Sequence, residues 1–275
     1  MIIMNCKIKI LSILVILSVL GTGCIEDRQN NVQTNHDLRY NIDKGNRFAY
    51  DLISSSEMPK NIRMLMHIKM VVSDSDSDLI TTRVVSTTST SGNKTESSYR
   101  LTMTDHGKLI KSESEDLMIP EIQPELPNTL VYPEKAVQKG ETWTNITKRE
   151  GTFTSKEGSI NYTVVSTKNY TCLGLKSISC KAGNFQCVGI NTDINFTLNM
   201  TSKTPNGTVY TIIVGKASGE NWVDLRGGFL VKSTYDVNKI IKMDFSEAYK
   251  KMGFGVFYRE TPINYQTVSE LLERR

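Results

Sequence analysis

The 275-residue sequence predicts a mainly β protein, with one large antiparallel sheet and one or two short helices. Apolar and polar residues alternate over long stretches, which is the period of a strand with one buried face. Turn signals such as Asp105-His106-Gly107 separate these stretches. About 250 residues follow the leader described next, which is enough for a single large β domain.

The N-terminus has the order of features found in a secretory signal. Lys7 and Lys9 precede an apolar run over residues 10–20, and small residues lead to Cys24. The apolar run is about half of the roughly 20 residues that a transmembrane helix needs. We therefore expect residues 1–23 to be a signal peptide and Cys24 to be lipidated, because a cysteine after small residues resembles a lipoprotein box. Two alternatives stay open: an incidental Cys24 near the cleavage site, or an uncleaved anchor.

The rest of the chain divides by composition. Residues 24–45 are polar and rich in Asn and Asp, so we expect a disordered tether. A single β-rich domain is predicted over residues 46–258. Residues 259–275 are expected to form a C-terminal tail with a short helix, and another short helix is expected over residues 244–251.

Within the domain, the first long strand shows the alternation most clearly. It covers residues 62–72, where apolar residues occupy one parity and Arg63, His67 and Lys69 the other. The Ser/Thr-rich residues 86–98 are expected to be a mobile loop. Further strands are predicted over residues 79–88, 97–104, 108–112, 142–154, 160–173, 185–200, 209–223 and 229–241.

A proline-rich segment interrupts the series. Residues 119–133 contain four prolines, a density that a central strand does not tolerate. We interpret this segment as a rigid crossover between two halves of the sheet; a domain boundary is the alternative.

Asn-x-Thr triplets are more frequent than chance predicts. Pairing 20 Asn with 28 Thr at random in 275 residues gives about two, whereas the sequence has seven and no Asn-x-Ser. In residues 190–200 the Asn side chains take the polar parity of a predicted strand. We expect a glycosylated outer sheet face. The alternative is that strand alternation alone places Asn and Thr two residues apart, although this does not explain the absence of Asn-x-Ser. The acceptor residues would be Asn93, Asn145, Asn161, Asn169, Asn195, Asn199 and Asn206.

Three cysteines remain beyond the leader and Cys24. In an exported protein, Cys172, Cys180 and Cys187 allow one disulfide and one free thiol. Cys172 with Cys187 is one candidate pair, Cys180 with Cys187 is its rival, and three buried thiols are the third alternative. No nearby histidine gives a metal-ligand spacing, so no metal is expected.

The methionines of the first long strand suggest a ligand face. Met64, Met66 and Met70 share its apolar parity. Methionine adapts to varied apolar guests, so these residues are candidates for bordering a lipid-sized cavity. The alternative is that they belong to the core.

Several function classes find no support in the residues. The formal charge is +4, and +2 without residues 1–23, with acids and bases interspersed, so no nucleic-acid partner is expected. The three histidines accompany no nucleophile motif, and no phosphate loop or cofactor motif is present, so neither enzymatic activity nor a cofactor is expected.

Three segments carry a family resemblance. They are Tyr132-Pro133 with residues 139–143, residues 181–187, and Trp222-Val223-Asp224 with residues 228–232. These segments resemble exported lipoproteins of archaea, especially methanogens, and more remotely the periplasmic lipoprotein carriers. The resemblance implies that the sheet is curved, as a half-barrel or open barrel, and supplies no catalytic residues.

Together these features predict a lipoprotein on the outer face of the cytoplasmic membrane. Its partners would be membrane lipid, through the anchor, and a bound lipid, envelope polymer or envelope protein. A purely structural envelope component is the alternative, and an enzyme with an unrecognised site is a third.

Overall fold

The computed structural model describes residues 35–58, 62–76, 78–90, 93–114, 130–155, 158–205, 207–251, 253 and 255–275. Within them lie eleven strands and one short helix, α2 (Ser246–Lys251). The strands are β1 (Arg47–Met58), β2 (Ile62–Asp76), β3 (Leu79–Thr90), β4 (Asn93–Thr104), β5 (Leu109–Ser114), β6 (Thr142–Ser155), β7 (Gly158–Cys180), β8 (Gly183–Thr204), β9 (Gly207–Asp224), β10 (Leu230–Asp244) and β11 (Tyr258–Arg274).

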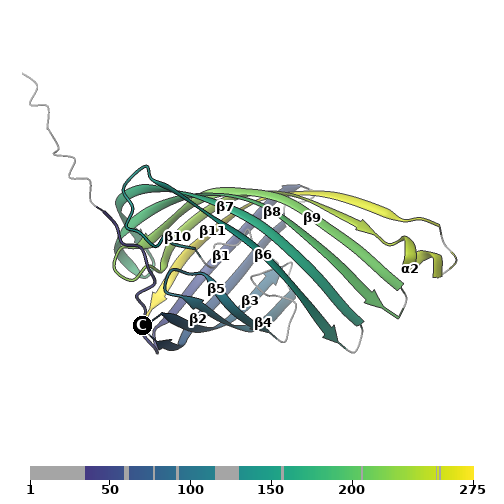
Figure 1. Cartoon of the computed structure of the whole chain (residues 1–275), viewed down its shortest axis with the longest axis horizontal. Coiled ribbons are helices and arrows are strands. Elements are labelled where there is room, and N and C mark those ends of the chain that lie inside the picture. Colours follow the sequence, from purple (N-terminus) through teal and green to yellow (C-terminus); the bar gives the residue numbers. More distant parts are fainter. Residues whose placement is uncertain are drawn as a thin grey trace, which may run out of the picture. The chain divides into compact units, whose positions relative to one another are not determined.

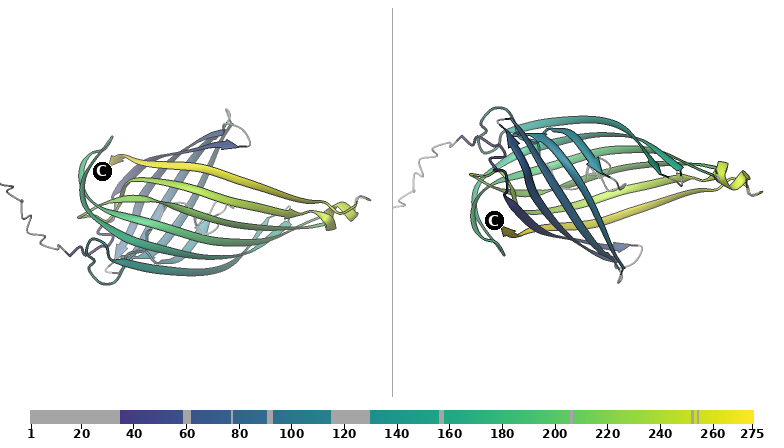
Figure 2. Two further views of the ribbon diagram at one scale, coloured as in Figure 1. Left: turned by 90° about the horizontal axis from the view of Figure 1, so that it is seen from above. Right: turned by 90° about the horizontal axis from the view of Figure 1, so that it is seen from below.

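These strands form one antiparallel sheet in the order β5-β4-β3-β2-β1-β11-β10-β9-β8-β7-β6. The sheet is strongly curled into a half-barrel, so that β1–β5 cross β6–β11 (Figures 1 and 2). Its two edge strands, β5 and β6, approach each other, and the guanidinium of Arg149 in β6 donates a hydrogen bond to the carbonyl of Leu109 in β5. The predicted fold class, including the curvature implied by the resemblance, is confirmed.

The core lies between the two crossing layers. We call the face that carries Leu52, Tyr170 and Tyr235 the inner face, and the opposite face the outer face. Where β1–β4 cross β8, β10 and β11, the inner face is fully buried. Its buried side chains include Phe48, Leu52, Met66, Val72, Val84, Leu101, Phe229, Val231 and Leu271.

Residues 35–45 take a defined place in the fold, which corrects the second half of the predicted tether. His36 pairs with Val137, and Leu38 and Ile42 are buried. Gly228 (φ 65°) lets this segment approach, because a Cβ there would overlap the carbonyl of Arg39. Although residues 35–45 are mostly polar, their alternating apolar side chains are buried in the core. The expected signal peptide, Cys24 and residues 25–34 lie outside the described residues.

The C-terminus also differs from the prediction. Residues 259–275 were expected to form a tail with a short helix, but they belong to β11, which pairs with both β1 and β10. Its inward side chains include Thr267 and Ser269, whose hydroxyl groups hide the alternation from a hydropathy pattern. The expected helix over 244–251 is confirmed as α2.

Two other features of the connections can be compared with the sequence. Residues 86–98 are not a mobile loop, since β3 and β4 pair along them and Ser86 bonds to Ser97 through hydroxyls 2.7 Å apart. Of the proline-rich crossover, residues 119–129 lie outside the described part, and residues 130–133 pack beneath the sheet, where Leu130 and Tyr132 are buried. Within the described residues, no helix combines the length and hydropathy needed to cross a bilayer.

Candidate functional site

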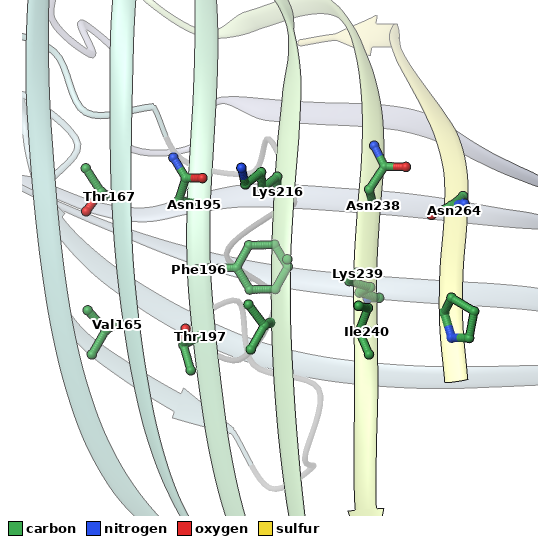
Figure 3. Close-up of a pocket in the computed structure, with 13 residues that line it drawn as sticks. Val165, Thr167, Asn195, Phe196, Thr197, Lys216, Asn238, Lys239, Ile240 and Asn264 are labelled. Atoms are coloured by element: carbon green, nitrogen blue, oxygen red, sulfur yellow. The ribbon is translucent and has the colours of Figure 1, made fainter. Parts of the chain in front are cut away.

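A groove crosses the outer face of β7–β11. It has a volume of about 590 Å³ and is formed by two parallel rows of side chains, each running across five strands (Figure 3). We call it the outer groove. Its apolar row contains Val165, Thr197, Val214, Ile240 and Pro262, which are direct cross-strand neighbours. Its polar row contains Thr167, Asn195, Lys216, Asn238 and Asn264, in register in the same way.

Strand alternation explains the polar row but not the apolar row. The outer face of these strands meets solvent, so its side chains are expected to be polar. Val165, Val214 and Ile240 are each between 39% and 46% exposed, although they are large aliphatic residues. An apolar row on a wet sheet face is the kind of patch that marks an interaction site.

Gly215 sits in the floor of the outer groove. It lies opposite Phe196 on the inner face, where a Cβ on residue 215 would overlap the Phe196 ring. Phe196 therefore lies directly under the β9 backbone (Figure 3). Because residue 215 has no side chain, the Phe196 ring packs directly against the β9 backbone that forms the floor of the outer groove.

The electrostatics of the outer groove are simple. Lys216 projects from the polar row, while Lys239 belongs to the inner face, where its Nζ lies 5.3 Å from the centre of the Tyr265 ring. The other lining groups are hydrocarbon, hydroxyl and amide. This set can contact a hydrocarbon chain along one side and hydrogen-bond or ion-pair with a polar group along the other.

A second hollow continues the groove toward β1. Its volume is about 390 Å³, and it shares Asn238 and Asn264 with the outer groove. It opens where the pairing of β1 and β11 slips, between Ser55 and Met58. The amide of Gln266 donates to Asp236 at 3.0 Å on its margin. The adjoining hollow is thus more polar than the apolar row.

The methionines proposed as a ligand face lie elsewhere. Met66 is buried in the core, and Met70 packs against the same cluster. The space beside Met70 has a volume of about 50 Å³, room for one or two water molecules and not for a lipid. Met64 lies opposite Ser54 in β1. Core packing accounts for Met66 and Met70, and the larger opening is on the other face of the sheet.

The three histidines are spread over the described chain. His67 Nδ1 lies 3.0 Å from Asp51 Oδ1, and His106 Nδ1 lies 2.7 Å from Asp105 Oδ1. His36 is buried, and burial lowers its pKa because the charged imidazolium is desolvated. Among the described residues, no group of three or more His, Cys, Asp or Glu side chains is placed to hold a metal ion.

The acceptor asparagines do not share one face, which corrects the prediction of a single decorated face. Asn161, Asn169, Asn195 and Asn199 lie on the outer face of β7 and β8 and are exposed. Asn145 is opposite Lys168, so it lies on the inner face, where its amide donates to Thr147 at 3.1 Å. Asn93 is exposed at the start of β4, with the parity of the inner face, and Asn206 lies outside the described residues.

No disulfide forms among the described cysteines. Cys172, Cys180 and Cys187 are free thiols. Cys187 lies opposite Lys176, four residues along β7 from both other cysteines. Four strand residues span about 13 Å, whereas bridged Cα atoms lie within about 7 Å. Either candidate pairing is therefore too wide. Burial raises the pKa of Cys187 to about 12, so this thiol stays protonated.

Comparisons with known proteins identify no family. No protein-family model and no curated protein matches the chain. One similar solved structure, described as an exported protein with a YmcC-like fold from Bacteroides fragilis, has 10% identity and a TM-score of 0.33, over 86% of this chain and 99% of that one. Another, described as a lipoprotein from Parabacteroides distasonis, has 12% identity and a TM-score of 0.34, over 87% and 100%. At this distance neither informs the chemistry of this chain, and neither comes from an archaeon.

Proposed function

We propose that this protein is an extracytoplasmic lipoprotein that binds an amphiphilic ligand in the outer groove. Export and anchoring are supported by the order of Lys7, the apolar run at 10–20 and Cys24. Binding is supported by one observation, the apolar row that crosses five strands on a solvent-facing sheet surface. The ligand class follows from the dimensions and chemistry of the groove.

The apolar row fits an extended hydrocarbon chain. Five strands spaced about 4.8 Å apart give a row about 19 Å long, which exceeds the length of a single ring and suits an acyl chain. Each methylene that leaves water on Val165, Val214 or Ile240 contributes about 0.8 kcal/mol. A chain lying there would place its polar end within reach of the neighbouring amides.

The polar row fits a headgroup with acceptor oxygens. Asn195, Asn238 and Asn264 offer amide donors and acceptors, and Lys216 offers an ammonium group. A carboxylate or phosphate would pair with Lys216 by a charge-assisted hydrogen bond. Fatty acids and membrane phospholipids both satisfy these requirements.

The experiment begins with the protein purified from its own membrane. Mass spectrometry of the intact chain reports a lipid on Cys24, any sugars on the acceptor asparagines and any co-purifying amphiphile. Binding of a fluorescent long-chain fatty acid is then compared for the parent, Val214→Lys and Leu175→Lys. Leu175 is a matched control, because it is 48% exposed on the same sheet and outside the groove.

We expect Val214→Lys to weaken binding by about tenfold or more, since losing contact with two methylenes alone costs about 1.6 kcal/mol. Leu175→Lys should bind as the parent does. Equal binding of the fatty acid by both variants would show that it does not bind in the outer groove. Absence of both a co-purified amphiphile and probe binding would instead favour a structural envelope component.

A further inference from the structure

We infer that the tip formed by α2 and the start of β11 is a membrane-docking site. The inference rests on the proposed function, since a lipid-anchored protein that binds an amphiphile works at a bilayer surface. The tip, at α2, lies at the opposite end of the long strands from the labelled C-terminus (Figure 1).

The tip leaves apolar side chains open to solvent over a large part of their surface. Val256 is 75% exposed, Tyr258 55% and Phe257 42%. Consecutive aliphatic and aromatic residues at a protrusion are costly in water, while aromatic rings with a polar end are favoured at the membrane–water interface. Their chemistry matches the boundary between headgroups and acyl chains.

Internal contacts position the described aromatic side chains of the tip. The Tyr249 and Phe257 rings stack with centroids 4.8 Å apart, and Phe245 packs edge-on against Phe257 at 5.7 Å. The backbone N–H of Phe257 donates to Ser246 Oγ at 3.2 Å. Phe257, the neighbour of Val256, is therefore held in place by these contacts, which limits the ordering entropy lost when it meets a bilayer.

The charges beside the tip suit an anionic surface. Lys250 and Lys251 occupy the last turn of α2, next to the exposed residues. The nearby acids are Asp244, Glu247 and Glu260, and the nearby bases are Lys242, Lys250, Lys251 and Arg259, so the tip carries a small net positive charge. Basic residues near a membrane surface contribute about 1 kcal/mol each toward anionic lipid.

An apolar stripe connects the tip with the outer groove. Tyr210, Ile212 and Val214 alternate along the outer face of β9, each between 43% and 47% exposed. Tyr210 lies opposite Asp244 at the base of α2, and Val214 belongs to the apolar row. A hydrocarbon chain that leaves the bilayer at the tip would meet apolar side chains all the way to the groove.

The test places a tryptophan at the tip. Anchored full-length protein carrying Val256→Trp is reconstituted into vesicles of phosphatidylcholine brominated in its acyl chains, with and without phosphatidylglycerol. Ile110→Trp in β5 is the matched control, because Ile110 is 51% exposed and lies on the other layer of the sheet. The parent measures quenching of the native Trp143 and Trp222.

We expect the added fluorescence of Val256→Trp to be lost in brominated vesicles, with a larger loss when phosphatidylglycerol is present. The added fluorescence of Ile110→Trp should persist. Equal quenching of the two variants, or none of either, would overturn the docking site. If the tip is not quenched while the fatty acid still binds, docking fails alone; if the tip is quenched and no fatty acid binds, the proposed function fails alone.

Discussion

The two ends of the long strands differ in what their faces bury. At the end of the long strands that carries the β9–β10 turn, β1–β4 cross β8, β10 and β11. Leu52, Val231 and Leu271 are fully buried there on the inner face. Toward α2, the inward-facing Ile213 and Ile241 are only half-buried, and the outer face carries the exposed apolar stripe. Packing energy is thus concentrated at the crossing, whereas the α2 end leaves apolar surface exposed.

The sharpest test of this comparison removes one large side chain from each region. Phe229 is buried at the crossing and contacts the Phe48 and Phe185 rings, with centroids 5.1 and 5.9 Å away. Phe229→Ala should lower the free energy of unfolding by about 3–5 kcal/mol. Ile240→Ala in the outer groove should lower it by less than about 1 kcal/mol. Urea denaturation measures both, and similar losses would contradict the division between the two ends.

Alkaline pH should act on the crossing through its tyrosines. Burial raises the pKa of Tyr40 from 10 to about 12, and it raises the pKa values of Tyr50, Tyr99 and Tyr132 as well. Because the folded-state pKa is the higher one, this contribution to stability is complete below pH 10 and is lost as pH rises from 10 through 12. For Tyr40 alone it amounts to about 2–3 kcal/mol.

The ultraviolet absorbance of tyrosinate, followed together with circular dichroism, measures this effect. Ionisation of the buried tyrosines should coincide with unfolding. A native-like spectrum that persists after all tyrosines have ionised would show that water reaches the crossing.

A smaller effect is expected at the α2 end of the sheet. Gly215→Ala places a methyl group against the Phe196 ring, and overpacking of this kind costs about 1–3 kcal/mol. Combining it with Phe196→Leu should recover part of that loss. Gly255→Ala is the control, because a Cβ there meets no atom within 4 Å, and thermal unfolding compares the three. If Gly215→Ala is as stable as the control, the Phe196 ring can move away from the added methyl group, and the packing under the groove is adaptable.

The sequence predicts the strands well where hydropathy alternates. Residues 62–72 and 185–200 lie within β2 and β8, because one face of each strand is buried. The prediction fails where inward positions carry hydroxyls, as at Thr267 and Ser269, since their burial depends on neighbours distant in the chain. It fails likewise for Leu38 and Ile42, whose partners are distant in the chain. Leu38 packs in the cluster of Leu130, Tyr132 and Val137, and Ile42 packs in the cluster of Val72 and Phe229.

The outer groove could have been suspected from the sequence but not located. The runs Ile212-Ile213-Val214 and Ile240-Ile241 break strict alternation, which signals apolar side chains on both faces. That these runs join Val165 and Pro262 in one row depends on the register of five strands, and single-sequence patterns do not fix register. The Met64, Met66 and Met70 pattern pointed to the core face instead.

The outer groove contains one of the predicted glycosylation sites, so the choice of expression host bears on the proposed binding of an amphiphile. Asn195 and Thr197 form an acceptor triplet, and both line the outer groove. An oligosaccharide on Asn195 would occupy the space that an acyl chain needs, so the two are mutually exclusive. Material from a host without N-glycosylation machinery would then have an open groove, and material from a glycosylating host a capped one.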